Sequence, residues 1–194
     1  MNIEDEFLSE VNDGIKQRSK KRKASCNAKV KGNNNERECA KLLTEHFKSS
    51  NLLFRRNVQS GAVVGGLNAK KTNLYTDEQL QMLASDLSCN NPKFAFSIEH
   101  KAYKDISFWD LFNESSNLNS WLEQCLTDAG KVHKMPWLII KINNHKRISF
   151  TPKEFSNNCC MKPKFTYNYN NLYFDCYWLE DLLNNTSDEF FLEN

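Results

Sequence analysis

Asp86, Glu99 and Lys101 are the residues of this chain whose types and spacing could support chemistry. Apolar residues alternate with small or polar ones over 94–101, and this period of two predicts a half-buried strand. Side chains two positions apart on a strand share a face, so Glu99 and Lys101 should project the same way, roughly 7 Å apart. If a strand carrying Asp86 pairs with this one, two carboxylates and an ammonium group converge on one small volume.

These groups suit the hydrolysis of a phosphodiester by an activated water. A divalent cation neutralises the charge that develops on the phosphate, and Mg²⁺ prefers oxygen ligands. Asp86 and Glu99 are candidate ligands, and the backbone carbonyl of His100 would face the same site. Lys101 would hold or deprotonate the attacking water, or offset charge in the transition state. Mg²⁺ is the expected metal and Mn²⁺ its expected substitute, whereas a surface ion pair on an edge strand is the alternative interpretation.

The net charge of +2 conceals a segregated distribution. Residues 1–13 contain five acidic residues, residues 171–194 contain six, and neither segment contains Lys or Arg. All 26 basic residues therefore lie within 14–170 with the other 13 acidic residues, so this section carries about +13. Eight of the basic residues fall within 16–31, where there is no acid. The distribution favours a polyanionic partner over a surface that is merely solvated.

Composition excludes several other classes of protein. No apolar run approaches the length of a membrane span, and the first ten residues are acidic where a signal peptide would be basic and then apolar. We therefore expect a cytoplasmic protein with no membrane partner, in the host cytoplasm if a phage encodes it. The seven cysteines are odd in number and form no CxxC pair, and the four histidines have no zinc spacing. Free thiols are expected.

Periodicity and turn residues predict an alternation of helices and strands. Helices are expected at about 33–48 and 107–129 and a short acidic one near 178–183, with strands near 52–58, 83–88, 94–101, 137–142 and 147–150. The order helix, three strands, helix, strands predicts an α/β core with a mixed sheet. We expect residues 1–30 to form a flexible arm, 31–150 the core with an insertion at 62–81, and 151–194 an extension whose aromatic residues pack on the sheet.

The first helix offers one more candidate, Glu36. Asn33 is expected as its N-cap, and Asn33-x-x-Glu36 has the form of a capping box, in which the carboxylate only bonds to backbone. On the residues alone, that capping interpretation of Glu36 is favoured.

Four segments in order resemble the motifs of archaeal-type Holliday-junction resolvases, within the PD-(D/E)xK nuclease superfamily. Residues 31–38 (KGNNNERE) resemble the KGxxxERE opening, 56–61 (RNVQSG) the Rx3SG segment, 85–87 (SDL) the acidic segment, and 99–101 (EHK) the ExK motif. The segment 62–81 is longer than its counterpart, and Ser85 stands where a proline is usual. The resemblance implies a restriction-endonuclease-like core.

The resemblance also implies roles for individual residues. Glu36 would reach the metal site from the first helix and join Asp86 and Glu99 as a ligand, with Lys101 as the catalytic lysine. Arg37 and Arg56 would contact the scissile phosphate or its neighbours, and Ser60 would lie beside them. The other basic residues near these segments are expected to bind DNA: Lys31, Arg55, Lys70 and Lys71.

The expected activity is that of a Mg²⁺-dependent, structure-specific DNA endonuclease. A Holliday-junction resolvase, which nicks branched DNA during recombination, is the leading interpretation. A four-way junction needs paired nicks, so a two-fold symmetric homodimer is expected. Two alternatives stay open: a restriction-like or nicking nuclease on duplex or single-stranded DNA, and a non-catalytic nucleic-acid-binding protein.

Overall fold

The computed structural model describes residues 29–57, 85–104, 117–156 and 161–193. The predictions for the arm before residue 29, for the insertion at 62–81, and for Ser60, Lys70 and Lys71 lie outside these ranges. The chain divides into two compact units, Met1–Asn34 and Asn35–Asn194. Residues 29–34 are the described part of the first unit, and they are helical. The sheet and the candidate site belong to the second unit.

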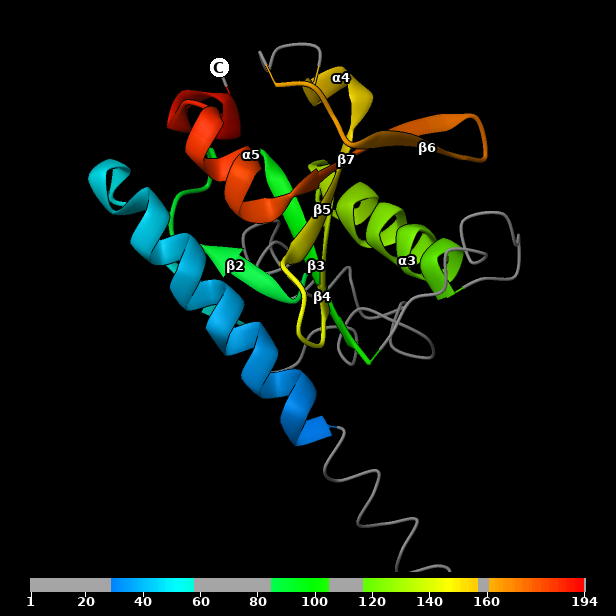
Figure 1. Ribbon diagram of the computed structural model, residues 1–194. Helices are drawn as coiled ribbons and strands as arrows, with labels where there is room; N and C mark the ends of the chain where they lie inside the picture. Colours follow the sequence, from blue (N-terminus) through cyan, green and yellow to red (C-terminus); the bar gives the residue numbers. More distant parts are fainter. Residues whose placement is uncertain (1–28, 58–84, 105–116, 157–160, 194) are drawn as a thin grey trace, which may run out of the picture. The chain divides into compact units, whose positions relative to one another are not determined.

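A sheet organises the second unit (Figure 1). In the described residues it has seven strands, in the order β1 (Phe54–Arg56), β2 (Leu87–Cys89), β3 (Phe96–Tyr103), β4 (Met135–Ile142), β5 (Arg147–Pro152), β7 (Leu172–Trp178) and β6 (Phe165–Tyr169). The β3–β4 pair is parallel, and the other neighbouring pairs are antiparallel. A parallel pair needs a crossover, and α3 (Asn117–Lys131) lies in the connection between its strands. The predicted α/β class with a mixed sheet is confirmed.

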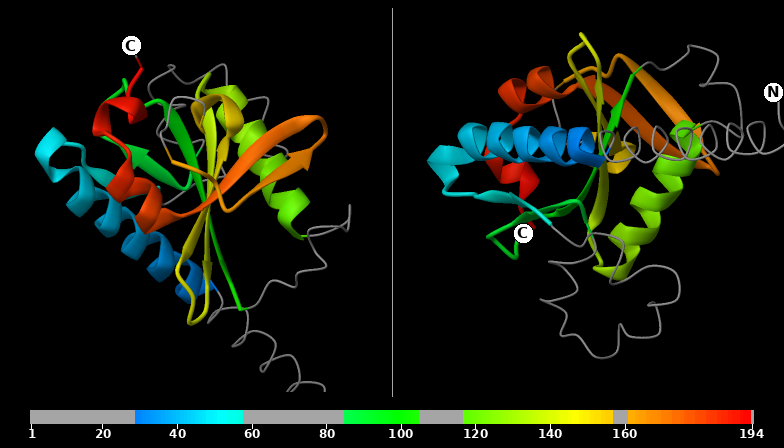
Figure 2. Two further views of the ribbon diagram at one scale, coloured as in Figure 1. Left: turned by 45° about the horizontal axis from the view of Figure 1, so that its top comes forward. Right: turned by 90° about the horizontal axis from the view of Figure 1, so that it is seen from below.

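Two apolar clusters lie on opposite faces of β4, and this explains its continuous apolar sequence. Trp137 and Ile139 face the cluster that includes the first helix and α5 (Leu179–Asn185), whereas Leu138, Ile140 and Ile142 face the cluster under α3. Figure 2 shows α3 and the first helix on opposite sides of the sheet. The strand is therefore buried on both faces, as its sequence predicts.

Short helices complete the second unit. They are the 3-10 helices Phe47–Ser50 and Asp188–Phe191 and the α-helical turn α4 (Lys153–Ser156). No helix among the described residues is long and apolar enough to cross a membrane. The described cysteines carry free thiols, as expected.

The prediction that Asn33 caps the first helix is wrong. Residues 29–46 are helical, so Asn33 lies inside a helix and the capping box with Glu36 does not form. Asn and Gly are poor helix formers, but helix stability in proteins comes mainly from the packing of an apolar face. Here Cys39, Leu43 and Phe47 are fully buried. Glu36 is therefore left with a carboxylate that is not engaged in a cap.

The aromatic residues within 165–178 enter the sheet itself. They fall on β6 and β7, which pair with each other, and β7 pairs with β5, whereas Phe155, Phe190 and Phe191 lie on the short helices. The hairpin turn contains Asn170 and Asn171, whose φ angles are 50° and 65°. Positive φ at both central residues is typical of the two-residue turns that connect hairpins, and Asn tolerates it. The expectation of aromatic residues packed against the sheet missed this pairing, because strand order is set by contacts far apart in sequence.

Candidate active site

Glu99 and Lys101 lie on the same face of β3, as the alternation predicts. Lys101 Nζ donates a hydrogen bond to Glu99 Oε1 and a second one, at 2.9 Å, to Oε1 of Gln124 on α3. Glu99 is buried, with 2% of its surface exposed, and Lys101 is half-buried. The ammonium group is thus held by two oxygens beneath α3.

Asp86 lies directly before β2 and next to β3. Its backbone N–H donates to the carbonyl of Ile98 at 3.0 Å, and its own carbonyl accepts from the Asn57 N–H at 2.8 Å. β2 and β3 are antiparallel, with Leu87 opposite Ile98. The expected pairing of the Asp86 segment with the Glu99 strand is therefore present.

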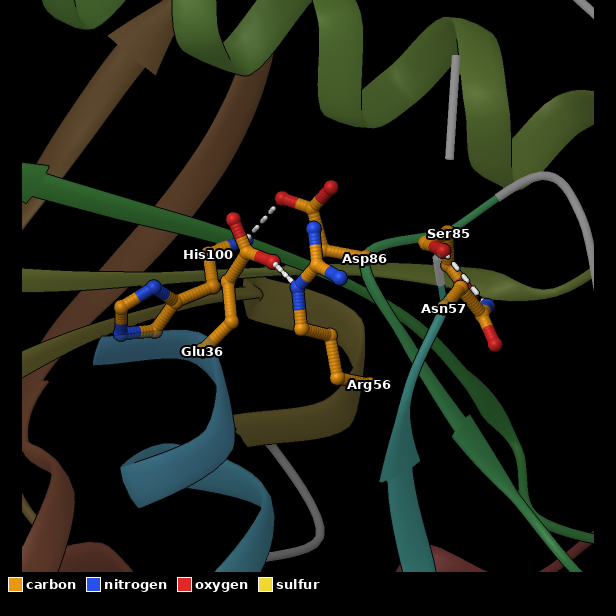
Figure 3. Close-up of polar contacts among 6 residues, drawn as sticks. All are labelled: Glu36, Arg56, Asn57, Ser85, Asp86 and His100. Carbon is orange, nitrogen blue, oxygen red and sulfur yellow. Dashed lines mark hydrogen bonds and ion pairs between the residues drawn. The ribbon is translucent and has the colours of Figure 1, made fainter. Parts of the chain in front are cut away.

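The side chain of Asp86 is anchored to the backbone of the Glu99 segment. Its Oδ2 accepts a hydrogen bond at 3.0 Å from the backbone N–H of His100 (Figure 3). The N–H and C=O of one strand residue point to the same side, toward the same neighbouring strand. The His100 carbonyl is therefore directed to the edge at which Asp86 lies.

Glu36 and Arg56 form an ion pair between the first helix and β1. Arg56 Nε donates to Glu36 Oε2. The exposed fraction is 16% for the Glu36 side chain and 14% for the Arg56 side chain. Figure 3 shows both side chains reaching toward the edge that carries Asp86. The glutamate of the first helix thus comes to the neighbourhood of Asp86 together with a guanidinium group.

Burial dominates the electrostatics of Glu99. It raises the pKa of the Glu99 carboxyl to about 8, the charge on Asp86 acts in the same direction, and Lys101 opposes it. Burial also acts to lower the pKa of Lys101, but the charge on Glu99 and the hydrogen bond to it more than compensate, so the net direction is upward. Burial lowers the pKa of His100 to about 4, and both ring nitrogens lack a hydrogen-bond partner among the described residues. Without a metal, Glu99 is therefore mostly protonated at neutral pH, beside a Lys101 that keeps its ammonium group.

A divalent cation fits the oxygens of this site. Asp86 and Glu99 offer carboxylates, and the His100 carbonyl faces the same edge, so the donors are hard oxygens of the kind that Mg²⁺ takes. Burial is the main reason for the raised Glu99 pKa, and a cation near the two carboxylates would offset the smaller contribution that the charge on Asp86 makes to it. Within the described ranges, no three His, Cys, Asp or Glu side chains are grouped closely enough to hold a metal. Water and substrate phosphate would complete the coordination.

The other described residues that were predicted to bind DNA are exposed. Arg37 follows Glu36 on the first helix and is exposed, as is Arg55 on β1. Lys31 is exposed within the first unit.

Two polar residues at the site were not predicted to take part in it. Asn57 Nδ2 donates to the Ser85 carbonyl at 2.6 Å, and so holds the residue before Asp86 (Figure 3). Gln124 binds Lys101, although from sequence it is simply a glutamine on the polar face of a helix. Neither residue carries a sequence signal of its own, because each contact joins segments more than 20 residues apart.

An Asp directly before one strand and a Glu-x-Lys on the neighbouring strand of a mixed α/β sheet are typical of the PD-(D/E)xK class of nucleases. The family model described as "Phage putative PDDEXK endonuclease" matches residues 27–190. The chain belongs to this family, and the predicted membership of the PD-(D/E)xK superfamily is confirmed.

Comparisons with individual proteins add one likeness. No curated protein matches the chain. Among solved structures, the chain is similar to Hjc of Archaeoglobus fulgidus, a Holliday junction resolvase from an archaeal hyperthermophile, with 11% identity and a TM-score of 0.32. The match covers 80% of this chain and 92% of that one.

Proposed function

We propose that this protein is a Mg²⁺-dependent DNA endonuclease that cleaves branched DNA, with Holliday junctions as its preferred substrate. The main support for nuclease chemistry is that Asp86, Glu99 and Lys101 lie close together. The His100 N–H binds the Asp86 carboxylate, and oxygens of Glu99 and Gln124 bind the Lys101 ammonium group. Membership of a PDDEXK endonuclease family supports the same class of reaction.

Asp86, Glu99 and the His100 carbonyl hold the metal in this proposal. The bound ion supplies neutralisation of the charge that develops on the phosphate and lowers the pKa of a coordinated water. Lys101 stays protonated, because the charge on Glu99 outweighs burial and raises its pKa. Its ammonium group donates a hydrogen bond to the attacking water and offsets the negative charge that develops in the transition state, and the proton of the water passes to solvent. Gln124 fixes the direction of that ammonium group.

Arg56 binds and orients the phosphate beside the metal, and its partner Glu36 would join Asp86 and Glu99 as a metal ligand, as the resemblance implies. The ion pair limits the rotamers of Arg56, so that its remaining N–H groups are presented in a fixed direction. Arg37 and Arg55 on the neighbouring surface bind the adjoining phosphates, with Lys31, Ser60, Lys70 and Lys71 as further contacts assigned from sequence. The basic middle of the chain provides long-range attraction for DNA.

The preference for branched DNA rests on the order of the motifs in the sequence, KGNNNERE, RNVQSG, SDL and EHK. A homodimer would place two such sites for paired nicks across a two-fold symmetric junction. A nuclease that acts on duplex or single strands has the same core chemistry and is the second candidate.

Cleavage of matched substrates tests this proposal. A labelled four-way junction and a linear duplex that contains the same arms are incubated with the protein in Mg²⁺, and the products are sized. We expect nicks in the junction at enzyme concentrations that leave the duplex intact. Equal cutting of both would remove the junction preference, whereas failure to cut either DNA, or a single strand of the same sequence, would remove the enzymatic function.

A further inference from the structure

We propose that Tyr103, supported by Trp121, is a stacking site for an unpaired nucleobase close to the cleaved phosphate. This inference rests on the proposed nuclease function and specifies the kind of DNA that the site accepts. Nothing in the motifs of the family resemblance includes either residue.

Tyr103 continues the catalytic face of β3. Residues 99, 101 and 103 alternate with residues that face the other way, so Tyr103 projects on the same side as Glu99 and Lys101. At the rise of a strand, the Cα of Tyr103 is about 13 Å from that of Glu99. Since one strand of B-DNA advances about 3.4 Å per nucleotide, a base within about four nucleotides of the reacting phosphate reaches the ring.

The Tyr103 ring is held in place from two sides. Its centroid lies 5.1 Å from that of Trp121 on α3, with the planes at 65° in an edge-to-face arrangement. Its hydroxyl accepts a hydrogen bond at 3.1 Å from Asn117 Nδ2, at the start of the same helix. The strand end is fixed too, because the Tyr103 carbonyl accepts from the Asn143 N–H at 3.3 Å. A ring with so few free torsions loses little entropy when it binds a partner.

The ring is nevertheless open to solvent. Tyr103 is 43% exposed, whereas its register partner Ile142 is buried in the cluster under α3, against which Trp121 packs. Trp121 thus covers the apolar cluster, and Tyr103 stands outside it. An exposed, immobilised aromatic ring on the face that carries the catalytic groups suits a π-stacking partner on the substrate.

The occupant must be a base that is not already stacked in a duplex. Bases in intact DNA have both faces covered by their neighbours, so an aromatic side chain gains contact only at a junction, flap, bulge or strand end. The exposed Lys104, next to Tyr103 in the chain, offers a positive charge to a phosphate beside such a base. The site therefore selects DNA that has an unpaired or splayed nucleotide beside the cut.

The experiment combines protein variants with base deletion. DNA is prepared with an unpaired nucleotide at each of four positions on either side of the cut, as 2-aminopurine or as an abasic residue. Binding is measured in Ca²⁺, which supports binding without requiring turnover, by anisotropy and 2-aminopurine quenching. Tyr103→Leu keeps an apolar side chain without a ring, Tyr103→Phe keeps the ring, and Tyr173→Leu is the control at another exposed tyrosine.

At one position, removal of the base should weaken binding by the wild-type protein roughly 5- to 100-fold. Tyr103→Leu should bind the DNA that keeps this base more weakly than the wild-type protein does, by the same factor. Its affinity for the abasic DNA should equal that of the wild type, and it should not quench 2-aminopurine fluorescence. Tyr173→Leu should behave as wild type, and Tyr103→Phe, which keeps the ring against Trp121 but loses the hydrogen bond from Asn117, should keep most of the effect of the base.

Two outcomes overturn the stacking site. If the wild-type protein binds and cleaves DNA, but Tyr103→Leu either changes nothing or weakens both DNAs equally, then the stacking site is wrong and the nuclease proposal stands. If the wild-type protein neither binds nor cleaves any of these DNAs, both proposals fail.

Discussion

The backbone N–H of His100 lies 3.0 Å from Asp86 Oδ2 and donates a hydrogen bond to it. This bond ties the side chain of the first acidic segment to the backbone between the Glu and the Lys of the second. The position of Asp86 relative to Glu99 is therefore fixed by backbone, independently of any metal. Preorganisation of this kind lets a site bind a cation without first assembling its ligands.

The raised pKa of Glu99 predicts that metal-free stability depends on pH. A carboxyl group whose folded pKa is about 8 stabilises the fold in its protonated form, and this contribution is lost as pH rises from about 4.5 through 8. We expect the melting temperature in EDTA to fall between pH 6.5 and 8, and the fall to be absent in Glu99→Gln. His100 has the opposite sign, since its lowered pKa costs stability as pH falls below 6.5, outside this window.

The same titration predicts proton release on metal binding. Mg²⁺ needs the ionised carboxylate, so its affinity should increase with pH across this range, and each ion bound near pH 7 should release a proton. Calorimetry in buffers of different ionisation enthalpy measures that release. Identical pH slopes of melting temperature for wild type and Glu99→Gln would contradict the assignment to Glu99.

The Glu36–Arg56 pair should be strongly coupled. Both side chains are largely buried, so removal of either leaves the other charge without compensation. We expect Glu36→Gln and Arg56→Gln to interact by about 1–3 kcal/mol in a double-mutant cycle of the free energy of unfolding. The exposed Lys48–Glu45 pair is the matched control and should give about 0.3–0.5 kcal/mol. Similar coupling in both cycles would mean that the Glu36–Arg56 pair is not held as described.

Arg147 joins three elements and should be a major anchor of the first helix. Its Nη2 lies 3.7 Å from Glu38 Oε2 on that helix, and its Nη1 lies 3.7 Å from Glu180 Oε1 on α5. Only 13% of its side chain is exposed, against 66% for Glu38. Arg147→Met should lower the free energy of unfolding by about 1.5–3 kcal/mol, and Glu38→Gln by less than about 1 kcal/mol. Urea unfolding measures both changes. Equal losses of unfolding free energy in Arg147→Met and Glu38→Gln would exclude the bridge through Arg147.

Gln124 should affect turnover more than substrate binding. Its Oε1 accepts from Lys101 Nζ, so Gln124→Ala leaves the ammonium group free to rotate away from the attacking water. We expect kcat to fall about 10- to 100-fold with KM nearly unchanged, and Gln124→Glu, which keeps the acceptor, to restore much of the rate. Glu123→Ala, the exposed neighbour on α3, is the control. A change confined to KM would show that Gln124 contacts DNA instead.

The local parts of this site could be predicted from sequence, whereas its long-range contacts could not. Alternation along the strand placed Glu99 and Lys101 on one face, because a period of two depends on the backbone alone. The start of the first helix was misplaced because local capping signals at Asn33 competed with packing farther along the helix. Hydrogen bonds from Asn57 to Ser85 and from Lys101 to Gln124 depend on how the strands and α3 come together. A single sequence carries no pattern for such contacts.

Mg²⁺-dependent cleavage of a labelled four-way junction by wild type and Glu99→Gln is the most direct test of the central claim. Glu99→Gln keeps the size of the side chain and removes the charge that holds the metal, and the variant should retain DNA binding in Ca²⁺. The account predicts cleavage by the wild-type protein in Mg²⁺, none in EDTA, and at least a roughly hundredfold lower rate for Glu99→Gln. A Glu99→Gln protein that cuts at the wild-type rate would contradict it.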